Sequence, residues 1–186
     1  MDIRELDRKA LDTLGALIAL VKPGDHRLPT PCDDWTLHGL IRHQVSDNLG
    51  FAAAAKGAGP DIATWNAGRL GDDPYAAYQA SARSMTEAFA DDEVLDRDLI
   101  VREFGSFPGR VALSMHVLDC TVHGWDVAQS LGVPYDPPRD LVEHALGVAA
   151  FIPADGREDR GSFAPVVDVD EDTDPLTRLL ALTGRR

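Results

Sequence analysis

Cysteine is scarce in this chain of 186 residues, which contains only Cys32 and Cys120. The two thiols lie far apart and form no C-x-x-C pair, so neither a disulfide framework nor a cysteine-based zinc site is indicated. No apolar run approaches the ~20 residues that a membrane-spanning helix needs. The first residues also lack the basic and apolar stretches of a secretory signal. We therefore expect a soluble protein of the reducing cytoplasm.

Positive charge is in short supply as well, since 18 Lys and Arg residues against 31 Asp and Glu residues give a net charge of −13. Proteins that bind nucleic acid or anionic lipid without specificity need a basic surface to meet the phosphates. Neither partner is expected here, and small molecules are favoured. The chain also has no internal repeat, nucleophile elbow, phosphate-binding glycine loop or dinucleotide fingerprint. Several common enzyme classes are thereby excluded.

Apolar residues recur at helical spacing through most of the chain. Caps, prolines and glycines divide this pattern into six predicted helices, at about 3–21, 35–56, 74–89, 110–131, 138–152 and 175–182. Residues 57–72 are predicted to form a loop, and residues 94–109 an extended connection or weak hairpin. Because 44% of the residues are hydrophobic, the length fits one globular domain over residues 1–186. An all-α, antiparallel helical bundle is the natural architecture.

The predicted helix over residues 110–131 carries a stripe of ionisable side chains. The stripe consists of His116, Asp119, His123 and Asp126. Their spacings of three, four and three place them on one face of a helix, with apolar residues on both flanks. We expect the opposite line, through Ser114 and Thr121, to be exposed, which directs the stripe toward the interior. Buried carboxylates and imidazoles then need partners or a metal, because each would otherwise cost several kcal/mol.

Two members of this stripe have the spacing of metal ligands. Asp119 and His123 lie one helical turn apart, and His43 on the second predicted helix is a candidate third ligand. Two nitrogens and one carboxylate oxygen suit Zn²⁺, or Ni²⁺, Co²⁺ and Fe²⁺ with less selectivity, and leave a position open for water or substrate. The alternative is a local ion pair between Asp119 and His123 beside an unrelated His43. The inferred burial favours the metal.

The remaining ionisable residues allow more than one interpretation. His116 could be a metal ligand, a partner that orients a ligand, an acid/base group or a polar residue at the rim of the stripe, and the rim position is favoured. Asp126 and Asp47 each either orient a nearby imidazole or add surface charge. Cys120 lies on the apolar flank and is expected to pack in the core. Cys32 precedes two acids that disfavour a reactive thiolate, so neither cysteine is a candidate nucleophile.

Several motifs taken together resemble a known family. They are Thr30-Pro31-Cys32-Asp33-Asp34-Trp35-Thr36, Leu40-Ile41-Arg42-His43, the run from His116 to Ala128, and the closing run from Asp174 to Arg185. In these motifs the chain resembles the DinB-like metalloprotein superfamily. Within it, the chain is similar to small proteins related to the N-terminal domain of mycothiol-dependent maleylpyruvate isomerase. The resemblance implies a DinB-like antiparallel four-helix bundle with additional short C-terminal helices.

The resemblance also implies a ligand set and a homodimer. Carried over position by position, the metal ligands are His43, Asp119 and His123, in a single DinB-like metal-binding helical domain. The isomerase has Glu where this chain has Asp119, so a shorter side chain has to reach the ion here. The isomerase also carries a further C-terminal domain that helps form its substrate site, so the resemblance does not extend to its substrate.

Three functional hypotheses follow from the residues and the resemblance. The leading one is a zinc-type metalloenzyme that uses a low-molecular-weight thiol, such as mycothiol, as cosubstrate in a transferase or isomerase reaction on a small electrophile. The ion would hold the thiol as its thiolate. The second is a metal-dependent hydrolase, in which the ion activates water. The third is a non-catalytic metal-binding or ligand-sensing module.

Overall fold

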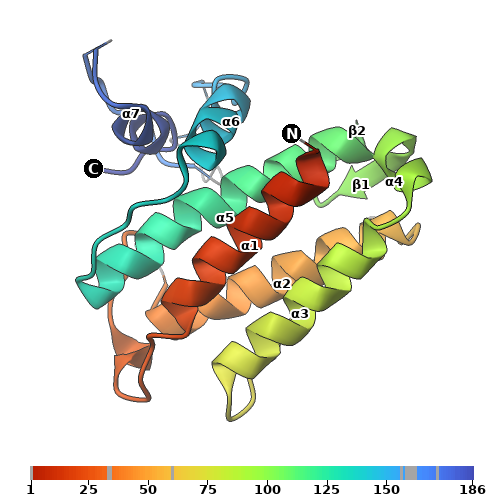
Figure 1. The fold of residues 1–186 in the computed structure, drawn as a ribbon, viewed down its shortest axis with the longest axis horizontal. Coiled ribbons are helices and arrows are strands. Elements are labelled where there is room, and N and C mark those ends of the chain that lie inside the picture. Colours follow the sequence, from red (N-terminus) through yellow and green to blue (C-terminus); the bar gives the residue numbers. More distant parts are fainter. Residues whose placement is uncertain (1, 33–34, 60, 156, 158–162, 171) are drawn as a thin grey trace.

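Four long helices form the body of the structure, a computed structural model that describes residues 2–32, 35–59, 61–155, 157, 163–170 and 172–186. They are α1 (Ile3–Ile18), α2 (Leu37–Ala55), α3 (Pro74–Ala88) and α5 (Gly109–Leu131). Two shorter helices, α6 (Arg139–Ala149) and α7 (Pro175–Leu182), lie along the side of α5 that faces away from α2 and α3 (Figure 1). The predicted all-α four-helix bundle with short C-terminal helices is confirmed.

Smaller elements connect the helices. They are the 3-10 turns η1 (Asp25–Arg27) and η2 (Thr64–Asn66), the short helix α4 (Asp92–Asp96), and the strands β1 (Asp98–Val101) and β2 (Gly105–Pro108). The strands pair antiparallel, so the predicted weak hairpin is confirmed, whereas α4 was not predicted. Within the part of the chain that the structure describes, no helix is both long and apolar enough to span a bilayer.

Capping residues set the helix ends that the sequence placed most accurately. The Asp73 side chain accepts a hydrogen bond from the backbone of Ala76 at the start of α3, where Pro74 follows the cap as expected. The Thr36 side chain likewise accepts from Gly39, so α2 begins at Leu37 rather than at the predicted Trp35. Trp35 is therefore left outside the helix.

Two predicted helix ends lie beyond the observed ones. Helix α1 ends at Ile18 instead of continuing toward residue 21, and α6 ends at Ala149 instead of reaching residue 152. After each helix, backbone amides donate to carbonyls three residues earlier in the chain: Val21 donates to Ile18, and Ile152 donates to Ala149. Apolar spacing continues through such a tightened turn, so periodicity alone overestimates the length.

The four bundle helices do not simply alternate in direction. Helices α1 and α5 run the same way, and α2 and α3 run together in the opposite direction (Figure 1). The connection between α2 and α3 therefore has to return along the length of the bundle, and this is the role of the predicted loop over residues 57–72. Trp65 anchors this connection, since it is 1% exposed and its ring lies 5.0 Å from that of Phe51, centroid to centroid.

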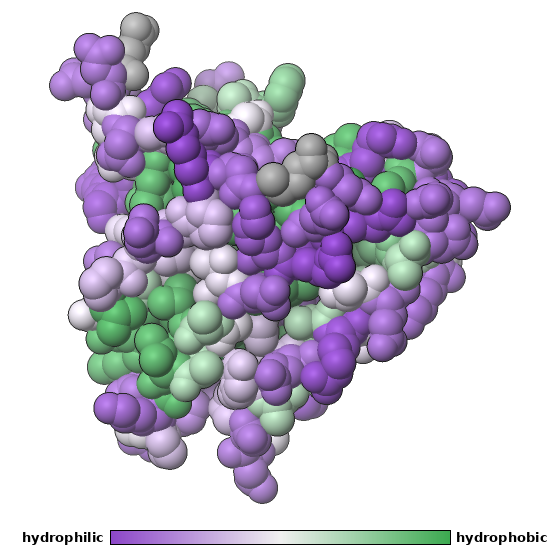
Figure 2. Space-filling view, viewed as in Figure 1, coloured by the Kyte–Doolittle hydropathy of each residue, from purple (hydrophilic) through white to green (hydrophobic). Residues whose placement is uncertain are grey.

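Helix α5 is buried on nearly all sides. The stripe faces the bundle, but the expectation that the line through Ser114 and Thr121 is exposed is wrong, because Thr121 is 2% exposed. Leu118 and Val122 form a second core cluster with residues of α6 and α7, which cover this side of the helix. A helical wheel of α5 carries no information about this extra layer. The face shown in Figure 2 is mostly hydrophilic, and apolar residues gather where α1 and α5 end.

A chain of hydrogen bonds crosses the core and joins all four bundle helices. His116 Nδ1 lies 2.6 Å from Asp7 Oδ1 on α1, and His116 Nε2 lies 2.8 Å from Asn48 Oδ1 on α2. Asn48 in turn donates to Ser81 Oγ on α3 over 2.9 Å. The predicted rim position of His116 is therefore wrong: the side chain is fully buried, at 0% exposure. Its polarity is tolerated because both ring nitrogens have partners.

Replacing Gly50 with alanine is expected to destabilise the fold. A Cβ at this position would lie 2.2 Å from Cε3 and 2.5 Å from Cδ2 of the buried Trp65 ring. We expect the free energy of unfolding to fall by about 2 kcal/mol, which urea unfolding would measure. Gly147→Ala on α6 is the control, because a Cβ there meets nothing within 4 Å and is expected to stabilise the helix slightly. Equal effects of the two substitutions would contradict the packing argument.

Asp7→Asn is expected to destabilise the protein in a pH-dependent way. Burial lowers the pKa of His116, but the adjacent Cys120 and Asp7 outweigh burial and hold this pKa well above its usual value. The charged pair therefore stabilises the fold fully below about pH 6.5, the unfolded pKa of histidine, and less as the pH rises through the raised value. At pH 6 we expect a loss of about 3 kcal/mol in urea unfolding.

The matched control for this prediction is Asp12→Asn, which changes an exposed carboxylate on the same helix. Its effect on the free energy of unfolding is expected to stay within about 0.5 kcal/mol at every pH. A loss for Asp7→Asn that grows with pH, or that equals the effect of the control, would rule out the charged pair.

Candidate metal centre

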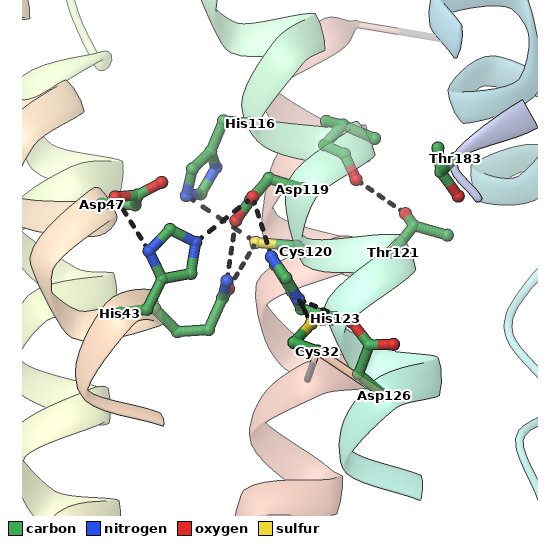
Figure 3. Close-up of polar contacts among 12 residues, drawn as sticks. Cys32, His43, Asp47, His116, Asp119, Cys120, Thr121, His123, Asp126 and Thr183 are labelled. Carbon is green, nitrogen blue, oxygen red and sulfur yellow. Dashed lines mark hydrogen bonds and ion pairs between the residues drawn. The ribbon is translucent and has the colours of Figure 1, made fainter. Parts of the chain in front are cut away.

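Three side chains from two helices converge on one point beside α5 (Figure 3). Oδ1 of Asp119 lies 3.6 Å from Nε2 of His43 and 3.4 Å from Nε2 of His123. The candidate ligand atoms of the three residues all lie within 4.8 Å of one another. The structure thus brings together the three residues that the sequence predicts as metal ligands. That they bind a metal stays a prediction.

The antiparallel contact between α2 and α5 explains why these residues meet. Asp119 and His123 are one turn apart on α5, so their side chains lie on the same face. On α2, Leu40 and Ile41 are fully buried and hold the first turns of the helix against the core. His43 follows them and points from α2 toward Asp119, as Figure 3 shows. The site therefore depends on the packing of two helices that are distant in sequence.

Each histidine has a carboxylate behind it. Nδ1 of His123 lies 2.8 Å from Oδ2 of Asp126, and Nδ1 of His43 lies 3.5 Å from Oδ1 of Asp47. Asp126 and Asp47, which the sequence left between an orienting role and surface charge, are 0% and 5% exposed. The hydrogen bond to Asp126 fixes a proton on Nδ1 of His123 and leaves Nε2 as the metal-binding atom, whereas Asp47 lies near Nδ1 of His43 at ion-pair distance. The pattern fits a metal ligand set.

The third candidate ligand, Asp119, is also held by a neighbouring side chain. Gln44 Nε2 donates to Oδ2 of Asp119 over 2.7 Å, which leaves Oδ1 facing the two histidines. Burial raises the pKa of Asp119, but His123 and His43 outweigh burial and hold this pKa well below its usual value. Asp119 is therefore a carboxylate at neutral pH, the form that binds cations.

The same charges act on the groups around Asp119. Burial lowers the pKa of His123, but the carboxylates of Asp119 and Asp126 outweigh burial and raise this pKa well above its usual value. Burial raises the pKa of Asp47 to about 6, with a further upward contribution from Asp119 and opposing ones from His43 and Arg102. A metal ion at Nε2 of His123 would compete with a proton for this nitrogen, so the affinity of the site for the ion would fall at low pH.

Cys32 lies on the far side of His123. Its Sγ is 4.0 Å from Nδ1 of His123 and 3.2 Å from Oδ2 of Asp126, so these three residues form a second candidate ligand group. The guanidinium of Arg185 already occupies that position, with Nη2 2.8 Å from Oδ2 of Asp126 and 3.5 Å from Cys32 Sγ. A second cation there would be repelled, which favours the group around Asp119. The two acids that follow Cys32 lie outside the described residues.

Sequence reasoning assigned no role in the site to Trp35, Gln44 or Arg185, all of which shape it. The centroid of the Trp35 ring lies 4.6 Å from that of His43 and 6.0 Å from that of His123. Because Trp35 is itself 36% exposed, it shields the two histidine rings from solvent only in part. Gln44 had a weak signal, since it directly follows His43. Arg185 had no signal in spacing or charge, because 59 residues separate it from Asp126. Its presence in the closing motif was the only indication.

Comparison with known proteins places the chain among relatives of similar length. Residues 8–128 match the family described as the mycothiol maleylpyruvate isomerase N-terminal domain. Two uncharacterized proteins of Mycobacterium tuberculosis, MT0763 from strain CDC 1551 / Oshkosh and Rv0738 from strain ATCC 25618 / H37Rv, are similar over 193 residues. Each is 28% identical to this chain, and the alignment spans 100% of this chain and 98% of the relative.

Solved structures show the same fold. The chain is similar to crystal structures of the mycothiol-dependent maleylpyruvate isomerase and of a histidine-to-alanine mutant of that enzyme, each with a TM-score of 0.63. The similarity covers 80% of this chain and 67% of the isomerase chain, at 16% and 15% sequence identity. The predicted DinB-like bundle is thereby confirmed. From the match over residues 8–128, this chain belongs to the family of the mycothiol maleylpyruvate isomerase N-terminal domain.

Proposed function

We propose that this protein binds a divalent metal ion, Zn²⁺ first of all, through His43, Asp119 and His123 in a single helical domain over residues 1–186. The observation that carries the proposal is the convergence of Nε2, Oδ1 and Nε2 of these residues. Two imidazoles and one carboxylate form a ligand set typical of catalytic zinc and leave a coordination position for an external ligand. Ni²⁺, Co²⁺ and Fe²⁺ are compatible with the same atoms.

The geometry supports direct ligation by an aspartate at this position. Oδ1 of Asp119 lies at nearly the same distance from the two histidine nitrogens, 3.6 and 3.4 Å. An ion bound by all three atoms would need contacts of about 2.0–2.2 Å. The hydrogen bond from Gln44 to Oδ2 limits how far the carboxylate can rotate and keeps Oδ1 toward the two histidines. These contacts support direct ligation by the shorter aspartate side chain.

A low-molecular-weight thiol of the mycothiol type is the proposed cosubstrate. The match to the mycothiol maleylpyruvate isomerase N-terminal domain supports this choice. A bound Zn²⁺ supplies a positive charge that favours the thiolate of this cosubstrate over the thiol. The protein contributes oriented ligands, since Asp126 and Asp47 hold the Nδ1 atoms, and a partial cover, since Trp35 lies over His43. The proposed reaction is a transfer to, or isomerisation of, a small electrophile.

Metal binding is tested by titrating Zn²⁺ into purified protein that has been treated with a chelator, and by elemental analysis of untreated protein. The wild type is expected to bind one equivalent. His123→Ala removes a proposed ligand, so the affinity for Zn²⁺ is expected to fall by more than about 100-fold. Loss of a residue that only hydrogen-bonds a ligand typically lowers metal affinity by about 10- to 100-fold. His38→Ala, which changes an exposed histidine on α2, is the control and keeps wild-type affinity. A wild type that binds no metal refutes the proposal.

Thiol binding is tested by calorimetric titration of the Zn²⁺-loaded protein with mycothiol. Heat of binding is expected for the wild type, because the ion offers an open position to the thiolate. His43→Ala is expected to give none, since it lacks one ligand of the ion. If the wild type binds Zn²⁺ but neither protein gives heat on addition of mycothiol, the proposal of a thiol cosubstrate is refuted. A hydrolase or a non-catalytic metal-binding module would then explain the site.

A further inference from the structure

The side chain of Arg185 ties the C-terminal end of the chain to the candidate metal centre. Its Nη2 lies 2.8 Å from Oδ2 of Asp126 and its Nε lies 3.3 Å from Oδ1, so the guanidinium contacts both carboxylate oxygens. Arg185 is 9% exposed at its side chain and Asp126 is 0% exposed. A two-point contact of this kind fixes the plane of the carboxylate as well as its position.

The backbone conformation after α7 directs Arg185 toward Asp126. Gly184 adopts a φ of +79°, which side-chain-bearing residues rarely adopt, and Ala164 leaves no room for a Cβ there. The amide of Gly184 donates to the carbonyl of Ala181, and the amide of Arg185 donates to that of Leu180 over 2.8 Å. These two bonds form a Schellman motif, which reverses the chain and directs Arg185 toward α5.

Asp126 transmits this contact to His123. Oδ2 of Asp126 lies 2.8 Å from Arg185 on one side and 2.8 Å from Nδ1 of His123 on the other. Without the guanidinium, a fully buried carboxylate would keep His123 and Cys32 as its remaining side-chain partners among the described residues. Both of these partners contact Oδ2, so Oδ1 would lose its side-chain partner and the plane of the carboxylate would no longer be fixed.

The other candidate ligand shows the same order of groups. Nδ1 of His43 faces Oδ1 of Asp47, and Nη1 of Arg102 lies 3.2 Å from that oxygen. Arg102 comes from the turn of the β1–β2 hairpin, where it adopts a φ of +43°. Each histidine is thus backed by an aspartate and an arginine, and each arginine comes from a segment outside the four bundle helices.

We propose that Arg185 is a positioning residue for the metal centre. It fixes Asp126, and Asp126 holds the imidazole of His123 with Nε2 toward the ion. The inference rests on the proposed function, because it concerns the affinity of the same metal site. It assigns to the C-terminal end of the chain a role in the site that lies outside the matched residues 8–128.

The test uses Co²⁺, whose visible absorption reports both affinity and ligand geometry. Arg185→Ala is expected to weaken Co²⁺ binding about 10-fold, the size of effect typical for outer partners of metal ligands. Arg186→Ala, which changes the exposed neighbour, is the control and keeps wild-type affinity. In the Asp126→Asn background, Arg185→Ala is expected to add no further loss, because Arg185 acts through Asp126.

The outcomes separate the two proposals. A wild type that binds no Co²⁺ refutes the metal site itself. Wild-type affinity and absorption in a folded Arg185→Ala variant, even with a lower unfolding temperature, overturn the positioning role and leave the metal site standing. Arg185→Lys keeps the charge but loses the two-point contact, so an intermediate affinity is expected. If Arg185→Ala does not fold, wild-type affinity in Arg185→Lys overturns the inference.

Discussion

An ionisable side chain on α5 needs a partner from another part of the chain, because this helix is buried on nearly all sides and an unpaired buried charge costs several kcal/mol. His116 finds Asp7 on α1, Asp119 faces His43 on α2, and Asp126 finds Arg185 beyond α7. These contacts link α5 to α1, to α2 and to the segment after α7, in addition to the apolar contacts of the core. The same requirement therefore connects the bundle, the C-terminal end and the candidate metal centre.

On neighbouring turns of α5, His116 and Asp119 have different surroundings and different roles. His116 is sealed in the core, where both of its ring nitrogens have protein partners, so it contributes to stability and to the alignment of four helices. One turn further along, the Asp119 side chain is 24% exposed, and Nε2 of both histidines faces its Oδ1. Access from solvent, and two Nε2 atoms that meet at one carboxylate oxygen, separate the candidate binding site from the structural pair.

The candidate centre is formed by the bundle helices together with segments outside the bundle. Its three candidate ligands come from long helices, whose relative positions are fixed by the core. The groups that orient the ligands come partly from the same helices and partly from the β1–β2 hairpin and the C-terminal end, which supply Arg102 and Arg185. The bundle thus positions the candidate ligands, while segments outside it contribute to the groups behind them.

The sequence by itself determined the long helices and the ligand candidates, because apolar spacing, caps and one-turn separations are local properties of the chain, and its motifs indicated the family. The tertiary structure alone decided that Thr121 is covered, that His116 lies in the core and that Trp65 anchors the return along the bundle. It also decided that Arg185 reaches Asp126 across 59 residues. A helical wheel describes one helix, whereas burial and charge pairing depend on whatever distant segment packs against it.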